Sequence, residues 1–373
     1  MTLLRTSILS WLIGSLLCTV PLLAITETNL PPRAKVFVTS DSRATTSFLT
    51  DSAVVRRLVV SGLVAFSGKD SPSKAWRSLV RSNDIVGFKV TSAPGALIGT
   101  RIDVVDALIS TLIAAGHPQS NIVIWDRDFK DLQSSGFVDL ASRLGVQTAA
   151  STDLGWDSTQ FYESGRSGKL VFGDLEFQSS LVLNTPKPFE SLPAWNLQQK
   201  VLEPSPRDQI RLGRRSHVSL LLTRKLTRII TVAPVMNHNA AGINGHLVSL
   251  AFGAFDNVFR FDGDPNRTAE SVPELCALDD LMPKVIFGVS DALLAQVQGE
   301  KTARLHETLA INEIRFSVDL VALDSLALAD IEAARSKLLL DGEKPFKTEL
   351  YGNAELLNLG VADPRRIDVI RVP

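Results

Sequence analysis

The stretch that decides the fold is residues 85–126, IVGFKVTSAPGALIGTRIDVVDALISTLIAAGHPQSNIVIWD. It begins with a compact apolar run, 85–90, and ends with another, 122–125. Between them, apolar residues recur at helical spacing from 104 to 113, and Gly116 with Pro118 ends that pattern. A strand, a helix and a second strand in this order predict a right-handed βαβ unit, and therefore a parallel sheet.

The loop after the first strand, TSAPGALIGT at 91–100, leads into the predicted helix. Thr100 and Asp103 have the T-x-x-D spacing of a capping box, so we expect the helix to open at Thr100. Gly95 and Gly99 free the backbone, and the first amides of the helix are placed to hold an anion, with Lys89 nearby. The alternative is a plain tight turn. The spacing matches neither G-x-G-x-x-G nor a P-loop, so it identifies no nucleotide-binding motif.

The remaining chain continues the alternation of strands and helices. Apolar runs predict strands at 35–38, 229–232, 285–289 and 367–372, and helical spacing predicts helices at 54–66, 243–255 and 323–338. Between 151 and about 226 the pattern is irregular, with short apolar pieces at 170–172 and 181–183. We therefore predict one α/β domain over 34–373, with a mostly parallel sheet, flanking helices and an irregular, partly antiparallel insertion at 151–226.

Residues 1–25 have the pattern of an export signal. Arg5 is the first charged residue and Glu27 the next, and 8–20 is an apolar core of suitable length. The apolar run is short for a spanning helix, and polar residues follow it at once. We expect cleavage near Ala24 or Thr26 and an exported protein, periplasmic or secreted, without stable membrane insertion. A retained anchor is the alternative.

Charge and cysteine usage exclude several classes of partner and cofactor. The formal net charge is −1, so nothing indicates nucleic-acid binding. The chain has two cysteines, and Cys18 lies in the expected signal. Cys276 alone allows the mature chain no internal disulfide and no iron–sulfur cluster of its own. The sequence therefore predicts stability from core burial.

A second informative stretch is 232–257, VAPVMNHNAAGINGHLVSLAFGAFDN, where a buried strand ends and a helix begins. α/β proteins commonly bind ligands at such a position. His238 is a candidate general base or metal ligand, and Asn239 and Asn244 are candidate hydrogen-bonding groups. His246 lies at the border of the apolar stripe, and we expect it to pack within the helix.

Polar residues also follow other apolar runs, as Lys89, Asp126, Asp291 and Asp319 do. Because the carboxyl ends of parallel strands share one edge of a sheet, we expect one crevice there. The candidate catalytic residues are His238, Asp126 and Asp291. The candidate ligand-binding residues are Lys89, Gly99, Thr100, Asn239 and Asn244. The alternative is that each aspartate caps the next helix. The absence of H-E-x-x-H, H-x-H and G-x-S-x-G motifs leaves metal and cofactor unknown and argues against the usual hydrolase nucleophile.

Three segments together resemble the DUF362 family, a widespread group of proteins of unassigned function. They are residues 86–137, residues 232–257, and residues 285–299 with 317–332. The resemblance implies an α/β fold and, in some relatives, association with ferredoxin modules; no such module is present in this sequence. It implies family positions at Lys89, Gly99, Thr100, Asp126, His238, Gly242, Gly245 and Asp291.

The chain departs from the family pattern at two lysines. Relatives tend to carry a lysine just before the histidine, where this chain has Met236 and Asn237. They also tend to have G-A-L-K-N where this chain reads GHLVS at 245–249. Asparagine can replace a hydrogen-bond donor but not the charge. The resemblance therefore implies a member with altered or lost activity.

Three functions follow as hypotheses. The first is an exported α/β protein that binds a small polar or anionic ligand in the crevice, with catalysis left open. The second is a binding or scaffold protein that kept the fold and lost the chemistry. The third is a redox partner, favoured by the ferredoxin associations of the family and opposed by the scarcity of cysteine.

Overall fold

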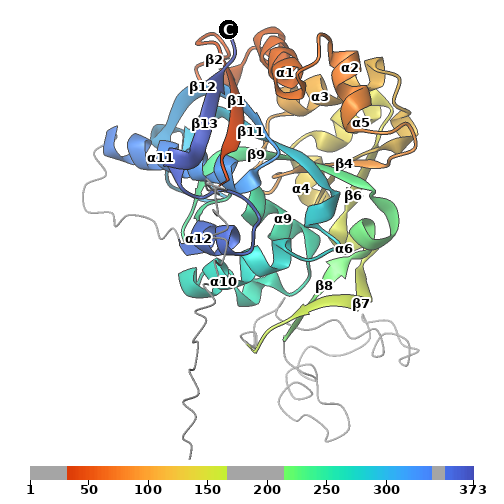
Figure 1. Cartoon of the computed structure of the whole chain (residues 1–373), viewed down its shortest axis with the longest axis vertical. Coiled ribbons are helices and arrows are strands. Elements are labelled where there is room, and N and C mark those ends of the chain that lie inside the picture. The colour runs from red at the N-terminus through yellow and green to blue at the C-terminus, as the bar shows by residue number, and fades with distance from the viewer. Residues whose placement is uncertain (1–31, 166–213, 338–348) are drawn as a thin grey trace, which may run out of the picture. The chain divides into compact units, whose positions relative to one another are not determined.

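The computed structural model describes residues 32–165, 214–337 and 349–373 (Figure 1). The expected export signal and the candidate strands at 170–172 and 181–183 lie outside these residues. Within the described ranges, nine strands form one sheet in the order β13-β1-β12-β11-β9-β4-β5-β6, with β10 beside β9. They are β1 (Ala34–Ser40), β4 (Val86–Val90), β5 (Ile122–Asp126), β6 (Gln147–Ala150), β9 (Arg228–His238), β10 (Gly242–Ile243), β11 (Val285–Gln296), β12 (Thr308–Ser317) and β13 (Ile367–Arg371).

Most neighbouring strands of this sheet are parallel. Parallel pairing joins β11 to β9, β9 to β4, β4 to β5, β5 to β6 and β1 to β13. β12 runs antiparallel to both of its neighbours, β11 and β1, and β10 runs antiparallel to β9. The prediction of an α/β fold with a mostly parallel sheet is confirmed.

Helices cover both faces of the sheet (Figure 1). One face packs against α1 (Ser52–Ser67), α2 (Pro72–Leu79), α3 (Ile102–Ala114), α4 (Phe129–Ser134) and α5 (Phe137–Leu144). The other packs against α9 (His246–Ala254), α10 (Pro265–Cys276), α11 (Leu320–Lys337) and α12 (Glu349–Leu356). Side chains of β5 alternate between the two cores, since Ile122 and Ile124 join the first and Val123 and Trp125 the second.

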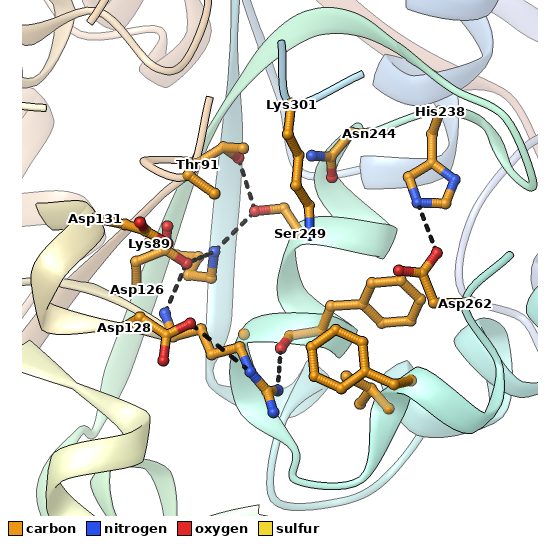
Figure 2. Close-up of a pocket in the computed structure, with 16 residues that line it drawn as sticks. Lys89, Thr91, Asp126, Asp128, Asp131, His238, Asn244, Ser249, Asp262 and Lys301 are labelled. Carbon is orange, nitrogen blue, oxygen red and sulfur yellow. Dashed lines mark hydrogen bonds and ion pairs between the residues drawn. The ribbon is translucent and has the colours of Figure 1, made fainter. Parts of the chain in front are cut away.

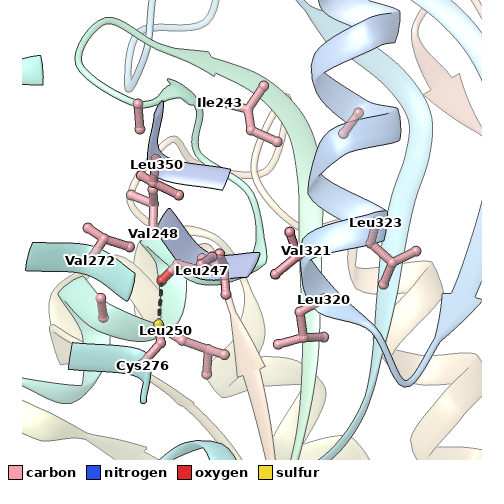
Figure 3. Close-up of a cluster of buried hydrophobic side chains, with 14 of the residues drawn as sticks. Ile243, Leu247, Val248, Leu250, Val272, Cys276, Leu320, Val321, Leu323 and Leu350 are labelled. Carbon is pink, nitrogen blue, oxygen red and sulfur yellow. Dashed lines mark hydrogen bonds between the residues drawn. The ribbon is translucent and has the colours of Figure 1, made fainter. Parts of the chain in front are cut away.

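The core of the second face is built around α9 (Figure 3). Leu247 and Leu250 of this helix pack in one buried cluster with Val272 of α10 and Leu320 of α11. Cys276 is buried there as well, and its thiol donates to the carbonyl oxygen of Leu247 at 3.4 Å. This packing fixes the helix that forms one wall of the site described below.

The start of α3 differs from the expected capping box. The helix begins at Ile102, and its preceding residue makes no side-chain cap. The Thr100 hydroxyl instead accepts the amide of Thr91 at 2.9 Å and donates to the carbonyl oxygen of Val232 at 2.7 Å. Asp103 accepts from Ser52 at 2.7 Å. Thr100 thus ties the loop to β9, because its hydroxyl bonds both Thr91, just after β4, and Val232 of β9.

The described part of the predicted insertion is antiparallel, as expected. β7 (Trp156–Glu163) pairs antiparallel with β8 (Arg215–Ser219) in a separate two-stranded sheet. Two further short strands, β2 (Thr45–Thr46) and β3 (Leu49–Thr50), also form an antiparallel pair. Among the helices of the described residues, none is both long and apolar enough to cross a bilayer.

The connections of β4 and β9 leave these two adjacent strands in opposite directions. From β4 the chain passes through α3 to β5 and on to β6, toward one edge of the sheet. From β9 it passes through α9 to β11, toward the other edge. Because α3 and α9 cover opposite faces, this reversal leaves a crevice at the carboxyl ends of the two strands.

Candidate functional site

A cavity of about 100 Å³ opens at this reversal point (Figure 2). That volume exceeds the roughly 10–15 Å³ that one water molecule needs, so a small ligand fits. Its walls come from the ends of β4, β5 and β9, from α9 and the turn after it, and from the loop between β11 and β12. The lining residues include Lys89, Thr91, Asp126, Arg127, Asp128, Asp131, His238, Asn244, Ser249, Phe252, Gly253, Phe259, Asp262 and Lys301.

Lys89 forms the floor of the cavity and is almost completely buried, at 1% exposure. Its ammonium group donates to Asp126 Oδ1 at 2.8 Å, to Ser249 Oγ at 2.8 Å and to its neighbour's carbonyl oxygen, Val90 O, at 2.7 Å. The nitrogen also lies 5.5 Å from the centre of the Trp125 ring. Since an ammonium group has three protons, every donor of Lys89 is already used.

Asp126 is the partner that compensates this buried charge. Its Oδ2 accepts from the amide of Ser92 at 2.7 Å and from the Ser92 hydroxyl at 2.6 Å, and its Oδ1 also accepts the Arg127 amide at 2.8 Å. Burial raises the pKa of Asp126, but Lys89 and Ser92 outweigh it and hold that pKa below its ordinary value. Burial lowers the pKa of Lys89 against the opposing pull of Asp126. Every polar atom of the pair thus has a hydrogen-bond partner within the protein.

Helix α9 reaches the cavity through Ser249 and Gly253. The Ser249 hydroxyl lies 2.8 Å from the Thr91 hydroxyl, so a chain of polar contacts runs from β5 through Lys89 to α9 and back to the end of β4. A Cβ atom at Gly253 would clash with the Lys89 side chain. The glycine lets the helix approach the buried lysine closely.

His238 lies at the end of β9 and is oriented by its own turn and by Asp262. The amides of Ala240 and Ala241 point at Nδ1 from 3.3 and 3.2 Å. Nδ1 is therefore the acceptor, and the ring proton sits on Nε2, 3.4 Å from Asp262 Oδ1. This interaction holds the pKa of Asp262 below its ordinary value. The imidazole ring also packs edge-on against Phe252.

Charged residues after β5 line the opposite wall. Arg127 donates to the carbonyl oxygens of Phe252 at 2.8 Å and Phe255 at 2.6 Å, which fastens the end of α9 to β5. Burial first, and then the charges of Asp128 and Asp126, raise the pKa of Asp131. Asp131 has no hydrogen-bond or ion-pair partner for its side chain among the described residues.

A second cavity of about 180 Å³ adjoins the first. His238, Asn244, Asp262 and Lys301 line both, so these four residues form the boundary between them. The second cavity extends to Asn237 and to residues 299–302 of the loop between β11 and β12. The site is thus a polar cleft with His238 near its middle.

The structure brings together four of the eight candidate site residues. Lys89, Asp126, His238 and Asn244 line the first cavity. Asn239 lies next to His238 but is exposed and lines neither cavity. Thr100 is engaged by backbone groups, and a Cβ at Gly99 would strike the carbonyl oxygens of Thr91 and Gly95, so both residues shape the loop beside the cavity.

Asp291 lies outside both cavities. It is fully buried inside β11, which continues to Gln296, and its Oδ2 accepts from the Arg101 amide at 2.8 Å and the Arg101 guanidinium at 3.1 Å. A carboxylate of the chain itself thus occupies the start of α3, where we expected an external anion. Asp319 is also away from the cleft. Because β12 is antiparallel, its end lies at the opposite edge of the sheet, where Asp319 accepts the Ala322 amide at 2.8 Å.

The sequence did not point to several residues of the cleft. Ser249 and Phe252 lie within the apolar pattern of α9, and Asp262 and Lys301 lie in loops without a recognisable motif. The spacing of Ser249 and Phe252, one helical turn apart, was the one available signal. In the ranges that the structure describes, no group of three or more His, Cys, Asp or Glu side chains is arranged to hold a metal ion.

Comparisons with known proteins do not extend this description. No family model matches the chain, and no curated protein matches it. A crystal structure of a protein from Thermotoga maritima is similar over 78% of this chain and 59% of its own, with 10% identity and a TM-score of 0.35. The chain therefore spans less than two thirds of that protein. Function must be inferred from the cleft itself.

Proposed function

We propose that this is an exported, DUF362-like protein that binds a small polar ligand in the cleft at the carboxyl ends of β4, β5 and β9. One observation carries the proposal: side chains from four separate parts of the chain converge on a cavity at the point where the strand connections reverse. His238 Nε2 lies in that cleft 3.4 Å from Asp262 Oδ1, a long contact that a hydrogen-bond acceptor on a ligand can replace.

The two departures from the DUF362 pattern favour binding without catalysis. Val248, at one of the two positions where relatives tend to carry lysine, is buried in the core of the second face. Asn237, at the other position, is uncharged. Its side chain donates a hydrogen bond to the Asn239 side chain and accepts one from the Glu300 amide. The redox hypothesis has no support from the cleft, whose described lining contains no cysteine.

A thermal-shift screen of the mature chain against small polar compounds and metal ions tests the proposal. A ligand at about 100 times its dissociation constant adds about 2.7 kcal/mol of stability. His238→Ala should abolish the shift and leave the fold intact. His306→Ala is the matched control, because that side chain is 76% exposed and lines neither cavity. An unchanged response in His238→Ala removes the cleft from the proposal.

Export is tested separately. N-terminal sequencing of the protein from the periplasm or the medium should find a chain that begins near Thr26, because the apolar core at 8–20 is followed at once by polar residues. A protein that begins at Met1 and stays in the cytosol contradicts this part of the proposal.

A further inference from the structure

The cleft offers an external anion fewer cations than its composition suggests. Lys89 has no free proton, since Asp126, Ser249 and Val90 accept all three. Arg127 directs its Nη1 to the carbonyl oxygens of Phe252 and Phe255 at the end of α9 and lies over the ring of Phe259, 5.3 Å from its centre. Lys89 is therefore saturated, and part of the Arg127 guanidinium is used to hold the wall of the cleft.

Lys301 is the exception. It lines both cavities, is exposed, and makes no hydrogen bond or ion pair with another residue in the described part of the chain. In Figure 2 its side chain extends into the cleft. Its loop is fixed on both sides of it: Asn237 Oδ1 accepts the Glu300 amide at 3.0 Å, and the Gln296 amide group donates to Thr302 O at 3.1 Å. Lys301 therefore presents an available ammonium group from an anchored backbone.

Asp131 is the complementary group on the other wall. It is half-buried, its side chain has no hydrogen-bonding partner among the described residues, and it lies near two further carboxylates. Those neighbours and burial raise its pKa, and the charge of Lys301 acts on it across the cleft in the opposite direction. A positive group placed beside Asp131 would relieve this repulsion.

Apolar and neutral groups lie between the two charges. Phe252 and Phe259 supply ring surfaces to the cavity, and Thr91 and Asn244 supply neutral polar groups. A purely anionic ligand would gain Lys301 but meet Asp128, Asp131 and Asp262. A purely cationic one would gain the carboxylates but meet Lys301. A molecule with both charges avoids each conflict.

We propose that the cleft takes a small zwitterion, a molecule with an ammonium group and a carboxylate on a short carbon chain. The carboxylate binds the ammonium of Lys301, the ammonium binds Asp131, and the carbon chain lies against Phe252 and Phe259. This inference rests on the proposed ligand-binding function and names the class of ligand. The first cavity, about 100 Å³, has room for a molecule of amino-acid size.

Calorimetric titration of the mature protein with matched compounds tests the inference. β-Alanine carries both charges, propionate only the carboxylate and ethylamine only the ammonium; glycine, acetate and methylamine form a shorter set. Since a hydrogen bond to a charged group is worth about 1.5–3 kcal/mol, we expect the zwitterion to bind at least about tenfold more tightly than either matched compound.

Two substitutions then separate the two ends of the ligand. Asp131→Asn should weaken the zwitterion to the level of the matched acid, and Lys301→Met should weaken it to the level of the matched amine. Lys69→Met is the control, because Lys69 is exposed in the turn between α1 and α2 and lines neither cavity. Thermal unfolding of each variant checks that the fold is retained.

The outcomes distinguish this inference from the function on which it rests. Propionate or ethylamine binding as tightly as β-alanine, or both variants binding like the parent, overturns the zwitterion inference and leaves the ligand site standing. So does a screen in which other compounds bind through His238 and no zwitterion does. If no compound in the thermal-shift screen binds, the proposed function fails and the inference fails with it.

Discussion

Lys89 and Asp126 line the cavity, but their hydrogen bonds all go to other groups of the protein. Both side chains are buried, and the bonds that saturate them come from β4, β5 and α9. A buried ion pair is sustained only when such additional hydrogen bonds satisfy both partners. We therefore assign Lys89 a positioning role: it holds α9 against the strand ends.

Removing one partner tests this role. Lys89→Met leaves the Asp126 carboxylate buried without its counter-charge, so we expect a loss of about 3–5 kcal/mol in the free energy of unfolding. Chemical denaturation measures it. The double variant Lys89→Met/Asp126→Asn should recover part of the loss, because it leaves no uncompensated charge. A double variant that is as unstable as the sum of the two single variants contradicts the assignment.

His246 predicts a pH dependence of stability. It is buried between Thr231 and Ser290, and burial lowers its pKa from 6.5 to about 3. The unfolded chain therefore binds a proton at His246 below pH 6.5 that the folded protein does not, so the contribution of His246 to stability falls as the pH falls from 6.5 toward 3. Each such proton contributes up to about 1.4 kcal/mol per pH unit to the slope.

The His246→Gln variant isolates this contribution. It keeps a polar group between the two hydroxyls and removes the titration, so the slope of its unfolding free energy against pH should be lower than the parent's, by up to about 1.4 kcal/mol per pH unit in this window. Asp324 acts in the opposite direction, because burial raises its pKa to about 7 and its stabilising contribution is lost as the pH rises toward that value. Equal slopes for the parent and His246→Gln between pH 4 and 6, measured by denaturation, would falsify the prediction.

At the scale of elements, α9 is the part of the fold on which the cleft most depends. Asp324 of α11 accepts the amides of His246 at 2.7 Å and Leu247 at 3.0 Å at the start of the helix. Arg127 binds carbonyl oxygens at its end. The helix is thus held at both ends by side chains from other elements, and its middle packs on Lys89.

Gly253→Ala tests how closely α9 must approach the strand ends. The added methyl group would overlap the Lys89 side chain, so we expect a destabilisation of about 1–3 kcal/mol and a weaker ligand response. Gly352→Ala in α12 is the control, since a Cβ there meets nothing within 4 Å. That substitution should leave stability unchanged or raise it by up to about 1 kcal/mol through helix propensity. Thermal unfolding of both variants gives the comparison.

The positions of most strands and helices could be predicted from the sequence, because apolar runs and helical spacing report burial directly. The directions and full lengths of the strands could not be predicted. The run before Asp319 indicates a strand but not that β12 is antiparallel, and pairing with β1 and β11 decides which edge Asp319 reaches. Asp291 was expected after a strand that in fact continues for five more residues beside β9, to Gln296. Lys89, Asp126 and His238, which line the cavity, lie at the ends of parallel strands.

For the whole molecule, cysteine content predicts the absence of an iron–sulfur centre. The chain has two cysteines, whereas a cluster usually needs about four thiolates. Cys276 is buried, and burial raises the pKa of its thiol. We expect purified protein to show no visible absorption from a cluster and no stoichiometric iron or sulfide. Acid-labile sulfide that co-purifies with a monomer would contradict this.

The antiparallel connection from β11 to β12 has a consequence for how the cleft can be altered. Residues 297–307 connect two adjacent strands, and Val297 N bonds Glu307 O at 2.9 Å, so the sheet fixes both ends of the loop. Val297 belongs to the core of the second face, whereas the loop residues after it can vary in length and sequence with little effect on either core. Exchanging the tip of this hairpin would replace Lys301 at the boundary of the two cavities. His238, Lys89 and α9 would stay in place, so the hairpin tip is a suitable position for engineering the selectivity of the cleft.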